Sequence, residues 1–240
     1  MLDNVIIVLC NPEEPRNIGS ACRAMLNMGI KTLRIVGRKE DYDEESVLRL
    51  AIHGKSVWED ASFYGTLKEA VSDCCICAGT TRRKGKKRKN WAMTPEEFAD
   101  FAGKDNKGKI AVVFGNERTG LTDAELEACS CCVNIPSWDG FPSLNLSHAV
   151  QIIAYVLFTH KPERKYGYEP VSIDETEKTV STMTKALKTM GFFKITDDHD
   201  MSLFFSSVLA RAALSKGEND YIKKIFNKIE GLYLRASKNQ

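Results

Sequence analysis

Short apolar runs alternate with segments of helical periodicity over the first 160 residues. The helical segments include Thr94-Pro95-Glu96-Glu97, a capping box with proline at the first helical position. Strands that alternate with helices predict an α/β fold, a parallel sheet with helices on both faces. The apolar, β-branched runs predict buried strands at residues 4–10, 32–36, 71–78, 110–114 and 131–135, and helical spacing predicts helices at 17–28 and 146–158.

The pattern changes at about residue 161. Residues 161–170, Lys-Pro-Glu-Arg-Lys-Tyr-Gly-Tyr-Glu-Pro, have the composition of a linker. Beyond it, apolar side chains recur at helical spacing in three segments, from Val180 to Met190, from Met201 to Leu214 and from Tyr221 to Leu232. The sequence therefore predicts a catalytic domain over residues 1–160, a linker over 161–170 and a small helical C-terminal extension over 171–240.

The composition is that of a globular protein, with 43% hydrophobic and 28% charged residues in 240. The longest apolar runs, such as Val5 to Cys10, are far shorter than the roughly 20 residues that span a bilayer. The N-terminus also lacks the basic segment and long apolar core of a secretion signal. We therefore expect a cytoplasmic protein with no membrane partner.

Eight cysteines include two C-x-x-C pairs, Cys74 with Cys77 and Cys129 with Cys132. Together the pairs suggest a zinc site. Against this, 51 residues separate the pairs, and positions three apart in a strand such as 71–78 point to opposite faces. Small buried thiols are the preferred interpretation, and we expect no metal.

Positive charge is concentrated in one segment although the net charge is only +2. Residues 82–89 carry seven positive charges in eight positions. Such a block is either a solvated loop or an arm that binds phosphates. The second interpretation assigns RNA binding to Arg82, Arg83, Lys84, Lys86, Lys87, Arg88 and Lys89.

Three strand-to-helix junctions are rich in Gly, Asn, Ser and Pro. They are Asn11 to Arg23, Phe114 to Leu121 and Phe141 to His148. Each also has a purely structural interpretation: a helix capped by Asn17, a turn with a local salt bridge, and an N-cap for the helix at 146. Open α/β sheets bind ligands at the carboxyl ends of their strands, so we expect the three junctions to form one site.

The three junctions contain the sequences N-I-G-x-x-x-R, F-G-N-E-R-T-G-L and S-L-N-L-S-H-A-V-Q. In this order and at these separations they resemble the three motifs of the TrmH/TrmJ-type (SpoU) methyltransferases of the SPOUT superfamily. Gly79-Thr80-Thr81-Arg82 and the helical tail resemble the TrmJ branch, so the likeness covers nearly the whole chain. Arg16 stands where a glycine is usual, and Asn116 where TrmJ proteins often have arginine.

The resemblance implies a fold, a reaction and partners. The fold is a SPOUT domain whose C-terminal segment forms a trefoil knot. The reaction is transfer of a methyl group from S-adenosyl-L-methionine to a ribose 2′-hydroxyl of tRNA, in the anticodon loop at position 32, which leaves S-adenosyl-L-homocysteine. The family works as homodimers without a metal, and Arg23 of one subunit completes the site of the other.

The resemblance also assigns roles to individual residues. The catalytic set is Arg23, Asn17, Glu117, Ser143 and Asn145. The cofactor-binding set is Gly79, Thr80, Thr81, Phe114, Gly115, Asn116, Ile135, Pro136, Ser143, Leu144 and Leu146.

Three alternatives stay open at this point. The enzyme could be a TrmH-like or ribosomal-RNA 2′-O-methyltransferase. It could instead be a non-catalytic, RNA-binding member of the family. An unrelated nucleotide-dependent α/β enzyme is the third alternative, although the chain has no G-x-G-x-x-G motif.

Overall fold

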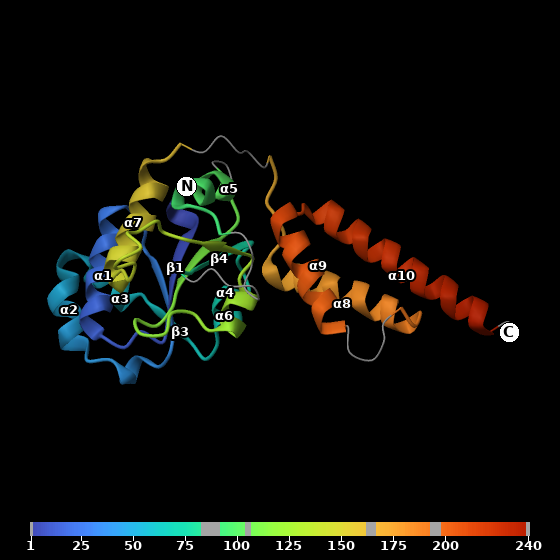
Figure 1. The fold of residues 1–240 in the computed structure, drawn as a ribbon, viewed down its shortest axis with the longest axis horizontal. Coiled ribbons are helices and arrows are strands. Elements are labelled where there is room, and N and C mark those ends of the chain that lie inside the picture. Colours follow the sequence, from blue (N-terminus) through green and yellow to red (C-terminus); the bar gives the residue numbers. More distant parts are fainter. Residues whose placement is uncertain (1, 83–91, 104–106, 162–166, 193–197, 239–240) are drawn as a thin grey trace.

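A computed structural model describes residues 2–82, 92–103, 107–161, 167–192 and 198–238. Its centre is a sheet of six parallel strands in the order β3-β2-β1-β5-β4-β6 (Figure 1). The strands are β1 (Val5–Cys10), β2 (Thr32–Val36), β3 (Ser62–Tyr64), β4 (Ile76–Thr80), β5 (Ile110–Phe114) and β6 (Cys131–Val133).

Helices cover both faces of the sheet, as predicted. They are α1 (Pro15–Asn27), α2 (Glu44–Ala51), α3 (Lys55–Glu59), α5 (Pro95–Ala102) and α7 (Leu146–Thr159) on one face, and α4 (Leu67–Val71) and α6 (Asp123–Ala128) on the other. Short 3-10 turns lie at Leu2–Asn4, Lys39–Asp41 and Ile52–Gly54.

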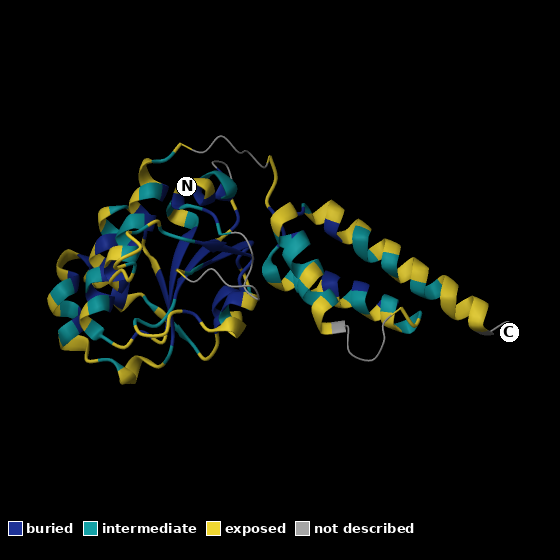
Figure 2. Ribbon diagram, in the orientation of Figure 1, coloured by how far each residue is buried: buried dark blue, intermediate teal, exposed yellow. Residues whose placement is uncertain are grey.

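Strand β1 shows why the sheet is buried on both sides. All six of its residues are buried (Figure 2), and they alternate between two separate cores. Val5, Ile7 and Leu9 pack under α1 and α7, whereas Ile6 and Val8 pack under α4 and α6. This period of two in a fully apolar run is the pattern of a central parallel strand.

The tail contains three helices, α8 (Ile173–Thr189), α9 (Asp198–Ala212) and α10 (Lys216–Lys238). They have a small core of their own, which includes Val180, Met183 and Leu209. The start of α8 joins the tail to the sheet domain, because the amide of Ile173 donates to the Cys74 carbonyl at 2.7 Å. Lys68 on α4 also pairs with Glu177 at 2.6 Å.

Several sequence predictions about elements were wrong. Residues 71–78 do not form one strand: α4 ends at Val71 and β4 begins at Ile76. Helix α1 is capped by Glu14, not Asn17, because Pro15 supplies the first helical position. The three-residue strand β3 was missed, since it is half-exposed and carries no apolar run.

The prediction that Cys74 and Cys77 point to opposite faces of one strand was also wrong. Cys74 precedes β4, and both side chains enter the core under α4 and α6 together with Cys129 and Cys132. All eight cysteines are buried free thiols. Burial raises the pKa of Cys74 to about 12, which keeps this thiol protonated and inert at neutral pH.

Two further observations concern metals and membranes. The described residues include no group of three or more His, Cys, Asp or Glu side chains placed to hold a metal ion. In the same part of the chain, every helix is too short or too polar to cross a bilayer. The trefoil knot stays a prediction.

Candidate active site

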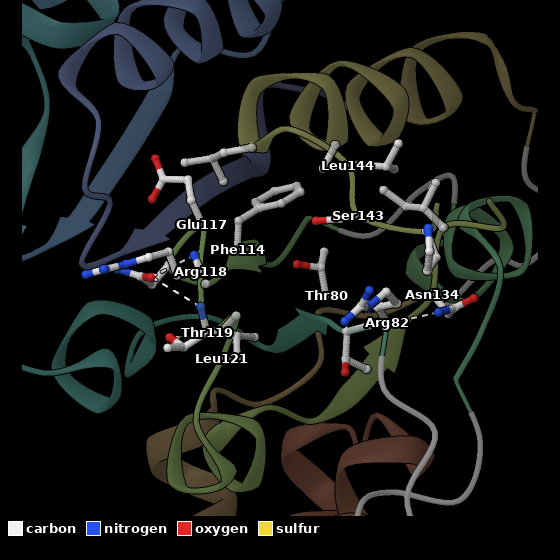
Figure 3. A pocket seen from close by; sticks show the side chains of 18 of the residues that line it. Thr80, Arg82, Phe114, Glu117, Arg118, Thr119, Leu121, Asn134, Ser143 and Leu144 are labelled. Carbon is white, nitrogen blue, oxygen red and sulfur yellow. Dashed lines mark hydrogen bonds between the residues drawn. The ribbon is translucent and has the colours of Figure 1, made fainter. Parts of the chain in front are cut away.

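One pocket lies at the carboxyl ends of β4, β5 and β6, where parallel sheets bind ligands (Figure 3). The Thr80 and Ser143 side chains and the Phe114 ring lie between the Glu117–Arg118 side of the pocket and the Asn134–Arg82 side. The lining residues are Thr80, Thr81, Arg82, Phe114, Gly115, Asn116, Glu117, Arg118, Thr119, Gly120, Leu121, Val133, Asn134, Ile135, Pro142, Ser143, Leu144, Leu146 and Ala149.

Most residues predicted to bind the cofactor line this pocket. Gly79 and Pro136 do not. A Cβ atom on Gly79 would lie 2.8 Å from the Cys129 sulfur, so this glycine lets α6 pack on β4. The predicted residues that line the pocket are Thr80, Thr81, Phe114, Gly115, Asn116, Ile135, Ser143, Leu144 and Leu146.

The loop after β5 is a closed turn that only glycine permits. The Gly120 amide donates to the Asn116 carbonyl at 2.8 Å, and Gly120 has a φ of +69°. A Cβ atom on Gly115 would lie 2.2 Å from the Gly120 carbonyl carbon. Both glycines are therefore required by the turn that presents Glu117 to the pocket.

Glu117 connects the first and second junctions. Its carboxylate accepts hydrogen bonds from the Glu13 amide at 2.8 Å, the Glu14 amide at 3.3 Å and the Asn17 side-chain amide at 2.9 Å. Asn17 lies in the first turn of α1, so these bonds fix the start of that helix against the loop after β5.

Asn145 adds the third junction to the same network. Its side-chain amide donates to the Asn17 side-chain oxygen at 2.8 Å. Its own oxygen accepts from the Ser147 amide at 2.9 Å, which is the N-cap bond of α7. Three predicted catalytic residues, Glu117, Asn17 and Asn145, thus form one hydrogen-bonded chain, although 128 positions separate Asn17 from Asn145.

Asn116 and Arg118 also bind the loop between β1 and α1. The Asn116 side-chain amide donates to the Asn11 carbonyl at 2.9 Å and to the Glu13 carboxylate at 3.0 Å. Arg118 pairs with the same carboxylate at 2.8 Å. The hydrogen bonds from Arg118 and Asn116 lower the pKa of Glu13, so the carboxylate stays charged at neutral pH.

Comparison with known proteins identifies the family. The SpoU rRNA Methylase family matches residues 4–155. This chain belongs to the SpoU methylase family. It is 31% identical to the tRNA (cytidine/uridine/adenosine-2′-O-)-methyltransferase TrmJ of Pseudomonas aeruginosa, over 96% of this chain and 95% of that one.

Two further relatives give the same picture. A tRNA (cytidine-2′-O-)-methyltransferase TrmJ of Methanocaldococcus jannaschii is 37% identical, over 69% of this chain and 72% of its own. The crystal structure of TrmJ from Z. mobilis ZM4 superposes with a TM-score of 0.77 at 27% identity, over 94% of this chain and 98% of that one. The likeness to the Pseudomonas aeruginosa and Z. mobilis proteins covers nearly the whole chain and therefore includes the helical tail.

Asn17 and Asn145 do not line the pocket of this SpoU methylase, but hydrogen bonds join them to Glu117, which does. Arg23 is the predicted catalytic residue that lies outside both the pocket and this network. It lies in the second half of α1, its side chain is exposed, and it is absent from the pocket lining. Ser143, in contrast, lines the pocket directly. The network and the pocket bring together Asn17, Glu117, Ser143 and Asn145 within one chain.

Arg82, predicted to bind RNA, proves to line the pocket. Its neighbours Thr81 and Asn134 connect β4 to the loop after β6, because the Asn134 side chain donates to the Thr81 carbonyl at 2.9 Å. The other six residues assigned to the basic arm, within 83–89, lie outside the described residues.

The sequence prediction missed several lining residues. Most belong to the same loops as the predicted residues, and the family resemblance assigned no role to them. Asn134 and Pro142 had a usable signal, since polar and turn-forming residues between β6 and α7 continue the third junction. The missed residues are Arg118, Thr119, Gly120, Leu121, Val133, Asn134, Pro142 and Ala149.

Proposed function

We propose that this SpoU methylase transfers a methyl group from S-adenosyl-L-methionine to a ribose 2′-hydroxyl of tRNA. One observation carries the proposal: the second and third sequence motifs line one pocket, and the first motif is joined to them by the hydrogen bonds of Asn17 with Glu117 and Asn145. The names of the TrmJ relatives, which match nearly the full chain, support the same reaction and substrate.

The pocket fits the cofactor by the chemistry of its walls. Ile135, Leu144 and Leu146 offer apolar surface for a purine ring, and Thr80 and Ser143 offer hydroxyl groups beside it. Backbone groups of Phe114 to Asn116 and of Asn134 and Ile135 would read the polar edges of the adenine. When bound, this cofactor supplies a methyl group already activated on a sulfonium, so the reaction requires no metal.

The protein must then position and activate a weak nucleophile. The ribose oxygen would form its bond to the methyl carbon as the carbon–sulfur bond breaks and its electron pair stays on the sulfur, and the hydroxyl proton would pass to solvent water. In-line placement supplies much of the rate, which is the role we assign to Asn17, Glu117, Ser143 and Asn145. A guanidinium rarely gives up its proton. Arg23 would therefore hold the ribose or its phosphate and stabilise negative charge on the oxygen.

Arg23 would act in the site of a second copy of the chain. Its exposed position on α1, outside its own pocket, is what such a role requires. We therefore propose a homodimer with shared sites. Light scattering at micromolar concentration should give a mass of about twice the 26.9 kDa of one chain. A monomeric mass would contradict the shared site but not the reaction.

The proposed substrate is a full tRNA, methylated in the anticodon loop at position 32. The helical tail supports tRNA over ribosomal RNA, because the likeness to TrmJ proteins covers it. Single-stranded loops expose their riboses, and the 2′-hydroxyl distinguishes RNA from DNA. A protein with this substrate works in the cytoplasm, where tRNA is.

The deciding experiment incubates unmodified tRNA with the protein and S-adenosyl-L-methionine and maps the product by mass spectrometry of nucleosides and fragments. A 2′-O-methyl group at position 32 is expected. A mark in the D-loop, or only on ribosomal RNA, would favour a TrmH-like or ribosomal enzyme. RNA binding without any methyl transfer would indicate a non-catalytic member of the family.

A further inference from the structure

The loop between β6 and α7 carries two unusually exposed aromatic side chains. Trp138 is 78% exposed and Phe141 is 74% exposed, more than any other large hydrophobic side chain that the structure describes. Leaving apolar surface of this size in water is unfavourable. A pair of such side chains in one short loop therefore indicates a binding partner.

The loop is closed and holds the indole ring in a defined place. The Phe141 amide donates to the Trp138 carbonyl at 3.0 Å, and the Ser137 hydroxyl donates to the Pro142 carbonyl at 3.2 Å. The indole ring folds over Gly140, where a Cβ atom would come within 2.4 Å of it. A ring that is already placed loses little conformational entropy when a ligand binds to it.

The loop lies at the pocket, but its two rings are outside it. Pro142, Ser143 and Leu144 line the pocket, whereas Trp138 and Phe141 do not. The methyl donor inside the pocket is therefore not what these rings contact. They are placed for whatever approaches the pocket from solvent.

The chemistry of the loop favours a base over a phosphate. Residues 134–145 contain no lysine or arginine, and Asp139, between the two rings, is negatively charged. Such a loop repels phosphates but offers flat aromatic faces on which unpaired bases stack. A cation for a phosphate is available from Arg82, which lines the same pocket.

We propose that Trp138 and Phe141 form a stacking platform for an unpaired base next to the ribose that is methylated. The proposal rests on the proposed function, since it takes the ligand to be a single-stranded loop of RNA. The base would be splayed out of its loop and held against the indole ring, with its ribose directed to the pocket. The platform would thus help to select the nucleotide and not the cofactor.

The test compares Trp138→Ala and Trp138→Phe with the wild-type protein, all loaded with S-adenosyl-L-homocysteine. Fluorescence anisotropy measures the affinity for an anticodon stem-loop RNA. Loss of the ring should raise the Kd roughly 5- to 100-fold, the effect of removing one base–aromatic stack. Phenylalanine should restore most of the affinity. Phe204→Ala, which removes a ring that is 57% exposed on α9, is the matched control.

Three results would overturn the platform. They are an unchanged RNA affinity of Trp138→Ala, an equal loss of affinity for S-adenosyl-L-homocysteine, and a lower mass by light scattering, which would make Trp138 a contact between two copies of the chain. Methyl transfer by the wild-type protein is measured separately. If no tRNA is methylated but Trp138→Ala still weakens RNA binding, the proposed function fails and the platform stands.

Discussion

Replacing Glu117 by glutamine should disconnect the three motifs while leaving the pocket walls in place. The carboxylate accepts three hydrogen bonds, from the Glu13 amide, the Glu14 amide and the Asn17 side chain. Glutamine has one acceptor oxygen, so its NH₂ group must face at least one of these donors. A hydrogen bond to a charged acceptor contributes about 1.5–3 kcal/mol. The start of α1 should then move away from Asn145.

If the energy of this hydrogen bond is lost in the transition state, kcat/KM for tRNA should fall by roughly 10- to 100-fold, because about 1.4 kcal/mol corresponds to each factor of ten. Transfer of tritiated methyl groups to tRNA measures the rate, and isothermal titration measures the affinity for S-adenosyl-L-homocysteine. Glu127→Gln makes the same charge change at an exposed position of α6 and should have no effect. Unchanged turnover of Glu117→Gln would refute the positioning role. An equal loss of cofactor affinity would show that Glu117 holds the cofactor instead.

Three further predictions use other parts of the chain. Arg23→Ala and Arg23→Lys should both abolish methyl transfer in the tritium assay with little change in titrated cofactor affinity, because a lysine lacks the planar fork; equal loss of both would make the residue structural. Neutralising four cations within 83–87 should weaken RNA binding. It should also lower the slope of the logarithm of the RNA-binding constant against the logarithm of the salt concentration by about 0.7–0.9 for each lost phosphate contact. An unchanged slope would mean that the segment is a solvated loop. The Arg34 guanidinium, with Lys109, holds the pKa of Asp73 well below its usual value of about 3.9. The charged Asp73 therefore stabilises the folded protein above about pH 4, and this contribution is lost as the pH falls below that value. Urea unfolding at pH 7 and pH 3 should show that acid lowers the free energy of unfolding less in Asp73→Asn than in the wild-type protein. An equal loss in both proteins would refute Asp73 as a source of acid sensitivity.

The sheet was predictable where burial decides the sequence. Residues 32–36 and 110–114 are strands with the predicted bounds. Residues 110–114 are a continuous apolar run because that strand is covered on both faces, and residues 32–36 are apolar apart from Thr32, which is exposed, and Arg34. The three-residue strand β3 and the five-residue helix α4 were not predictable in this way. Elements of that length contain too few positions for a period to be recognised.

The site was predictable as a set of loops but not as a network. The motifs indicated which loops meet, since the carboxyl ends of parallel strands share one edge. The hydrogen bond from Asn145 to Asn17 joins residues 128 positions apart, and no local pattern encodes it. Trp138 belongs to no motif, and its exposure is a property of the folded chain that the sequence pattern did not predict.

The two departures from the family pattern act on the same short loop. Arg16, which replaces the usual glycine, pairs with Glu14 at 2.9 Å and holds the pKa of that carboxyl at about 2. Asn116, which replaces an arginine frequent in TrmJ proteins, binds the Asn11 carbonyl and the Glu13 carboxylate.

Both substitutions therefore supply contacts to residues 11–14, the segment that leads from β1 into α1. Asn11 itself has a φ of +46°, a left-handed conformation that is unfavourable for most side chains and tolerated best by asparagine after glycine. External bonds that hold this turn preserve the direction in which α1 leaves the sheet. Since α1 carries both Asn17 and Arg23, the departures change how this helix is held without removing a group that the proposed reaction needs.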